Sequence, residues 1–177
     1  QPGAYNLLID SSKVAWLGTE LTTKTHFGSL RAKSGNLKID KDGGVVGNIT
    51  IDMQSILVED LKGRSKEVLE SHLKSDDFFD VKNHQRAKLE IISSENIGGN
   101  QFLFKGNLTI KEKTNFVQMK GSVQKLNSGY SADINLVFDR SKYDVKYRSA
   151  AFFSDLGDRI ISDDVFLNVK IKLNKTI

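Results

Sequence analysis

The stretch SHLKSDDFFDVKNH, residues 71–84, gathers the side chains of this chain that are best suited to chemistry. Two of the three histidines, His72 and His84, flank three aspartates there. Imidazole nitrogens and carboxylate oxygens can bind a hard cation or a transition metal. The spacing matches none of the HxH, HxxxH or HExxH metal motifs. We therefore expect no metal site: the acids keep a loop soluble, and His72 packs on the face of a helix.

Other catalytic and metal-binding motifs are also incomplete. Asp40 and Asp42 in DKDGG begin like a calcium loop, but Ile51 stands where a bidentate glutamate belongs, so the stretch is a predicted turn. No serine lies in a G-x-S-x-G elbow, and no glycine-rich phosphate loop leads into a helix. We expect no catalytic residue and predict that the protein is not an enzyme.

Length and composition describe one ordinary domain, residues 1–177, with 38% apolar residues and no cysteine. The net charge is +4 without a block of lysine or arginine, which argues against nucleic-acid binding. No apolar run is long enough to cross a bilayer, so no integral membrane segment is expected. The chain starts at Gln1 rather than methionine, which suggests a processed or trimmed N-terminus.

Alternation of apolar and polar side chains with a period of two dominates the sequence. It predicts strands at 4–10, 13–22, 29–40, 45–53, 86–95, 102–110, 117–123, 130–138 and 165–173. Polar residues at the alternate positions indicate strands that are buried on one side, as in antiparallel sheets. Short turns between the strands predict an all-β closed barrel or sandwich of about eight strands.

One segment breaks this rhythm. KGRSKEVLESHLKS, residues 62–75, places Val68, Leu69, His72 and Leu73 at helical spacing among strong helix formers. It predicts a helix of about ten residues with Ser65 as its N-cap.

Glycines stand on the inward face of several predicted strands, notably Gly47, Gly106 and Gly121. Two interpretations stay open: the strands coil or bulge at these positions, or the missing side chains leave a bore. The other inward residues are aliphatic or aromatic. A bore would thus favour a lipid-like chain, at about 0.8 kcal/mol per buried CH₂.

Seven segments, in order, resemble the YceI-like family of lipocalin-like polyisoprenoid-binding barrels. They are YNLLIDSSKVAWLG (5–18), HFGSLRAKSGNLKID (26–40), IDMQSI (51–56), HLKSDDFFDV (72–81), GNLTIKEKT (106–114), DRSKYDVKYRS (139–149) and FFSDLGDRIISDDVFLNVKI (152–171). Together they cover almost the whole chain. Gln85 departs from the family's usual proline, which affects a turn rather than the fold.

The resemblance implies an extended antiparallel lipocalin-like β-barrel of about eight strands, with one or two short helices and a long internal tunnel. It also implies export to the periplasm and binding, storage or transport of a polyisoprenoid, an isoprenoid quinone or a fatty-acid-like chain. The bound lipid would be the ligand, with no other cofactor, and homodimer formation stays open. The helix would dock through Leu69 and Leu73, while Phe78 and Phe79 would turn inward and seal one mouth or line the tunnel.

Inward apolar residues are the predicted tunnel wall, although each also has a plain role as core: Trp16, Phe27, Ile49, Ile51, Phe79, Phe102, Phe104, Met119, Ile134, Phe138, Phe152 and Leu167. The candidates for contact with a head group are Tyr143, Tyr147, Arg148 and Arg159 in the loop-rich C-terminal third. The alternative function is an exported, non-enzymatic stress or surface interaction protein with a solid core, which would expose an apolar patch.

Overall fold

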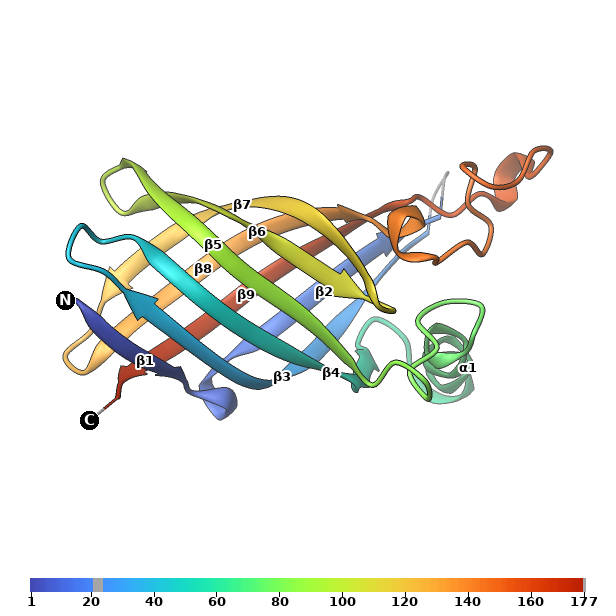
Figure 1. Cartoon of the computed structure of the whole chain (residues 1–177). Helices are drawn as coiled ribbons and strands as arrows, with labels where there is room; N and C mark the ends of the chain where they lie inside the picture. Colours follow the sequence, from blue (N-terminus) through green and yellow to red (C-terminus); the bar gives the residue numbers. More distant parts are fainter. Residues whose placement is uncertain (21–23, 177) are drawn as a thin grey trace.

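The computed structural model describes residues 1–20 and 24–176, and these form nine strands and a few short helices (Figure 1). The strands are β1 (Gly3–Leu7), β2 (Lys13–Thr19), β3 (Thr25–Ile39), β4 (Val45–Val58), β5 (Arg86–Gly98), β6 (Gln101–Ile110), β7 (Lys113–Lys125), β8 (Gly129–Asp139) and β9 (Asp164–Lys175). The helices are α1 (Gly63–Lys74) and the 3₁₀ turns η1 (Ile9–Ser11), η2 (Arg140–Tyr143) and η3 (Gly157–Arg159).

The sheet closes on itself to form a barrel. Its strand order is β1-β3-β2-β9-β8-β7-β6-β5-β4, all neighbours are antiparallel, and the pairing of β3 with β4 closes the circle. Both β1 and β2 lie between β3 and β9: Tyr5 of β1 pairs with Leu37 and Lys175, while Trp16 of β2 pairs with Gly28 and Leu167. Nine strands therefore fill eight positions, which confirms the predicted all-β barrel of about eight strands.

The predicted strands are present with shifted ends. β1 stops at Leu7 because the chain turns through η1, so the predicted strand 4–10 is shorter than expected. β3 already begins at Thr25, before the predicted start at 29. The predicted strand 13–22 forms β2 as far as Thr19, and its positions 21 and 22 lie outside the described residues.

The alternation of side chains sets the core. Inward residues such as Leu108 and Ile110 of β6 and Ile134 and Leu136 of β8 are buried, whereas the intervening Val137 points outward and is exposed. One continuous apolar cluster therefore lies on the inside of the barrel. Among the described residues, every helix is too short or too polar to span a membrane.

Helix α1 lies at the end of the barrel opposite the two chain termini (Figure 1). It begins at Gly63, so the prediction of Ser65 as N-cap is wrong. The residue at the cap position is Lys62, whose backbone is extended and whose side chain makes no capping hydrogen bond. Glu70 Oε1 accepts a hydrogen bond of 2.9 Å from the backbone N–H of Val58, which fastens the helix to the end of β4.

Candidate functional site

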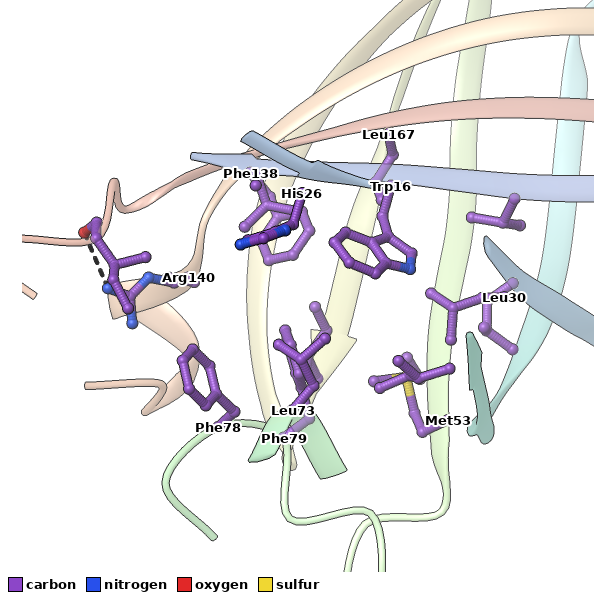
Figure 2. A pocket seen from close by; sticks show the side chains of 18 of the residues that line it. Trp16, His26, Leu30, Met53, Leu73, Phe78, Phe79, Phe138, Arg140 and Leu167 are labelled. Carbon is purple, nitrogen blue, oxygen red and sulfur yellow. Dashed lines mark hydrogen bonds between the residues drawn. The ribbon is translucent and has the colours of Figure 1, made fainter. Parts of the chain in front are cut away.

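An apolar cavity of about 160 Å³ lies inside the barrel at the end that α1 covers (Figure 2). Its walls come from β2, β3, β4, β5, β6, β8 and β9, because each strand directs every second side chain inward. The apolar lining residues on these strands are Val14, Trp16, Leu30, Ile51, Met53, Ile56, Ala87, Leu108, Ile110, Phe138, Val165 and Leu167. Such a lining suits hydrocarbon and offers water few partners.

The helix and the loop that follows it cover the mouth of this cavity. Leu69 and Leu73 of α1 line it together with Phe78 and Phe79, at the end where these four residues were expected. Figure 2 shows Leu73, Phe78 and Phe79 at this mouth. The backbone N–H of Phe79 donates to the carbonyl of Leu73 at 3.1 Å, turning the loop back onto the helix. Lys111 Nζ donates to the carbonyl of Phe78 at 3.0 Å, which holds the loop against the β6–β7 turn.

The other half of the barrel is filled with its own side chains. Ile49, Phe104, Met119 and Ile134 are all buried there within the continuous core, and none of them lines the cavity. Phe102 is partly buried and stacks on Phe104 with ring centroids 6.0 Å apart. The cavity under α1 therefore does not extend to these residues, and it is shorter than the long tunnel that the resemblance implied.

The inward glycines do not create the hollow. A Cβ at Gly106 would lie 2.1 Å from the carbonyl oxygen of Glu90, and a Cβ at Gly121 would lie 2.2 Å from that of Asp133. Neighbouring backbones occupy the space where side chains would be, as strongly coiled strands require. The interpretation as strand coiling is correct, and the interpretation as a bore is wrong.

The predicted wall residues fall into three groups. Trp16, Ile51, Phe79, Phe138 and Leu167 line the cavity. The five residues of the filled half, described above, are core. Two predicted positions are wrong: Phe27 is 48% exposed, because its neighbour His26 takes the inward position on β3, and Phe152 is 46% exposed in the loop after η2. Contact of the first group with a ligand stays a prediction.

None of the four predicted head-group residues lines the cavity. Tyr143, the last residue of η2, is buried against the ring of Phe138, and burial raises its pKa to about 12. Tyr147 and Arg148 line a separate shallow hollow on the outside, with Arg148 stacked 5.2 Å from the Tyr147 ring centroid. Arg159 is exposed on η3 and donates to the carbonyl of Leu156. Contact of these four residues with a head group stays a prediction, although none of them lines the cavity.

Arg140 is a polar residue of the cavity wall that sequence reasoning missed. Its Nε, Nη1 and Nη2 donate to the backbone carbonyls of Ser162, Val145 and Ile161, each at 3.0 Å. Nη2 also lies 3.4 Å from Oδ1 of Asp163. Burial lowers the pKa of Arg140, and the charges of Asp163 and Asp139 oppose that shift. The guanidinium thus ties the end of β8 to the segment that leads into β9.

His26 is the second missed polar residue. Its ring lies in the cavity with Trp16, Phe138 and Arg140 (Figure 2), and its Nδ1 is 2.7 Å from Oδ2 of Asp60. The other oxygen, Oδ1, accepts from the backbone N–H of Phe27 at 3.1 Å. Burial by itself would raise the pKa of Asp60, but these two hydrogen bonds outweigh it and leave that pKa below its usual value.

Strand alternation was the signal that could have found both residues. Arg140 is two residues beyond the inward Phe138, and His26 is two residues before Gly28, which faces Trp16. The other polar residues of the lining are Thr19, Glu20 and Ser162, and Gly18 and Ile161 complete it.

The histidines and aspartates of residues 71–84 form two separate pairs. His72 Nε2 lies 3.0 Å from Asp77 Oδ2, and His84 Nε2 lies 3.8 Å from Asp80 Oδ2. Within residues 1–20 and 24–176, no three His, Asp or Glu side chains are grouped so that they could hold a metal ion. His72 packs edge-on against Phe78 and Tyr147, so it joins the helix to the loop after η2.

Solved structures share this barrel. BcnA of Burkholderia cenocepacia is 21% identical, with a TM-score of 0.72 over 93% of this chain and 98% of that one. A polyisoprenoid binding domain from Saccharophagus degradans, implicated in plant cell wall breakdown, is 14% identical, with a TM-score of 0.65 over 99% and 100% of the two chains. The Campylobacter jejuni YCEI protein is 21% identical, with a TM-score of 0.54 over 74% and 73%.

These identities establish a common fold. No curated protein sequence gives a significant match to the chain. The YceI-like domain family matches residues 5–173, which span the barrel from β1 to β9. The chain therefore belongs to the YceI-like domain family.

Proposed function

We propose that this barrel binds the hydrocarbon chain of a lipid-like amphiphile in the cavity under α1. The observation that carries the proposal is a cavity inside the barrel whose lining is almost entirely apolar. Each buried CH₂ would contribute about 0.8 kcal/mol, before the cost of ordering the chain. The relative from Saccharophagus degradans, a polyisoprenoid binding domain, supports the same class of ligand.

The size of the cavity limits how much chain it takes without rearrangement. Its volume of about 160 Å³ is close to that of an engineered cavity of ~150 Å³ that binds benzene. A longer chain would enter if side chains at the mouth moved. Leu73, Phe79 and Met53 are unbranched at Cβ and lie at that end, so they are suited to such a shift.

Binding rather than catalysis is the role we assign. The ligands that we propose are a polyisoprenoid, an isoprenoid quinone or a fatty-acid-like chain, carried or stored by an exported, periplasmic protein. These finer assignments rest on membership of the family, and the ligand needs no further cofactor.

Native mass spectrometry of the purified protein, followed by solvent extraction, tests the proposal. We expect an adduct with the mass of an amphiphile, which extraction removes. The stripped protein should then take up a fluorescent fatty acid. An unliganded mass together with no uptake of the probe would reject lipid binding.

A row of exposed apolar residues on the outer face supports a second candidate function, that of a non-enzymatic interaction protein. Phe27, Leu17, Phe166 and Val137 are neighbours across β3, β2, β9 and β8, and three of them are about half exposed. A solid interior was the other expected mark of this function, and the cavity does not fit it. Failure of the lipid tests, together with self-association that is lost in Phe166→Ser, would favour this candidate.

A further inference from the structure

His26 places the polar edge of its ring in a cavity that is lined mostly by apolar side chains. Binding of hydrocarbon alone gives this polar edge no role. Asp60 is an acceptor when ionised, so the proton on Nδ1 of His26 is directed to it. This leaves Nε2 as the ring nitrogen available to another molecule. No hydrogen bond joins Nε2 to any residue in the described part of the chain.

The position of His26 fits the head of an amphiphile. It lies near the end of β3 that α1 covers, among residues of the mouth such as Gly18 and Glu20. Leu30 lines the cavity four residues further along the same strand, about 13 Å along its length toward the interior at the usual rise of a strand. A tail that filled the inner cavity would therefore leave its head beside the imidazole.

Besides His26, the lining carries one basic and one acidic side chain. Arg140 is the basic one, but three of its five N–H groups are used by backbone carbonyls and its Nη2 lies 3.4 Å from Asp163 Oδ1, so most of its binding capacity is already used. Glu20 is the negative group of the lining and lies at the end of β2, close to solvent. An acid entering this apolar space needs a partner for its charge, and the His26–Asp60 pair offers one.

We propose that His26, held by Asp60, binds the acidic head group of a single-chain amphiphile, a carboxylic acid or a phosphate monoester. This inference rests on the proposed function. The carboxylate or phosphate enters as an anion, Nε2 takes up a proton from solvent, and the resulting imidazolium donates to that anion on one side and to Asp60 on the other. An alcohol and an ester carry no charge, so neither forms this ion pair.

Competition by four ligands with the same octyl tail tests the site: octanoic acid, octyl phosphate, 1-octanol and methyl octanoate. Each displaces a neutral fluorescent probe from lipid-free protein. We expect the acid or the phosphate to bind about tenfold more tightly than the alcohol and the ester. Comparison of octanoic acid with octyl phosphate shows whether the site prefers a carboxylate or a phosphate.

His26→Gln and Asp60→Asn provide two separate variants, so the test survives if one of them fails to fold. In both, the ratio of acid to alcohol affinity should fall toward one. His84→Gln is the matched control, because His84 pairs with Asp80 outside the cavity, and it should keep the wild-type ratio. A nitrogen-15 spectrum should also show protonation of Nε2 in His26 when octanoic acid is added.

The outcomes separate this inference from the proposed function. Equal binding of all four ligands by the wild type would overturn the head-group site and leave lipid binding intact. A preference for acids that persists in both His26→Gln and Asp60→Asn would also overturn the head-group site and leave lipid binding intact. Failure of all four ligands to displace the probe would count against both proposals.

Discussion

The guanidinium of Arg140 lies 5.9 Å from the ring centroid of Phe78. Arg140 follows β8 and Phe78 follows α1, so this cation–π contact joins the barrel to the loop that covers the cavity. Lys111 reinforces the same junction, since its Nζ also donates to the carbonyl of Asp144 at 2.9 Å. The covered end of the barrel is thus held by long basic side chains that bind backbone carbonyls.

Replacement of Arg140 should destabilise the protein even when the charge is kept. In Arg140→Lys a single ammonium cannot reach three carbonyls that the planar guanidinium binds together, so buried acceptors lose their partners. We expect a loss of about 2–4 kcal/mol in the free energy of unfolding, measured by urea denaturation.

Arg159→Lys, on the exposed η3, is the control and should change stability by less than ~0.5 kcal/mol. Equal stability of the two variants would show that the carbonyl contacts of Arg140 matter little.

The glycines of the coiled strands give a second prediction. Gly106→Ala places a Cβ 2.1 Å from the carbonyl oxygen of Glu90, so the backbone must move. We expect a loss of about 1–3 kcal/mol, as for other overpacked positions. At Gly18, no described heavy atom lies within 4 Å of the added Cβ, so Gly18→Ala is the matched control and should be nearly neutral. Thermal unfolding of both variants measures the difference, and similar losses would contradict the role of close strand approach.

Much of the barrel follows from local pattern. A period of two identifies the inward face of strands such as β6 and β8 without knowledge of their neighbours, and the same rule extends to Arg140 and His26. Arg140 follows the predicted strand that ends at Phe138, and His26 precedes the predicted strand that begins at Ser29, so neither was assigned to an inward face. Strand ends were less certain, since the turn at η1 and the early start of β3 depend on which strands pair.

The extent of the hollow could not be read from the sequence. Phe104 and Phe138 are both inward aromatic residues of long strands, yet Phe104 lies in solid core and Phe138 lines the cavity. The difference depends on which side chains face them from the opposite wall, and that is set by the closure of the barrel. The glycines were wrongly interpreted as a bore for the same reason. Only the register of strand pairing shows that Gly106 pairs with Ile91, beside a shift in the β5–β6 pairing.

Alkaline pH should reveal the burial of Tyr143. Burial raises its pKa in the folded protein to about 12, from about 10 when unfolded. The folded state therefore keeps this proton more tightly. Its contribution to stability is complete below pH ~10 and is lost as pH rises toward 12.

Tyr143→Phe removes this contribution, so stability should fall less steeply between pH 10 and 12 than in the wild type. Urea denaturation at each pH measures the slope. Absorbance at the phenolate band should also show Tyr143 among the last tyrosines to ionise. Tyr147→Phe is the control on the partly exposed loop after η2. Identical slopes for wild type and Tyr143→Phe would show that Tyr143 ionises normally.

Filling the cavity from one wall should abolish ligand capacity without loss of the fold. Gly18 lies in the lining of the mouth, and the described residues leave space beside it, so Gly18→Leu directs an isobutyl group into the hollow. The part of the ligand chain that this group displaces is no longer buried, which costs ~25 cal/mol per Å² of apolar surface. We therefore expect the affinity for a fluorescent fatty acid to weaken about tenfold or more. Ala15→Leu places the same leucine side chain on the outer face of the same strand and should leave uptake unchanged. Circular dichroism should show a folded barrel for both. Normal uptake by a folded Gly18→Leu variant would mean that the chain is bound somewhere other than under α1.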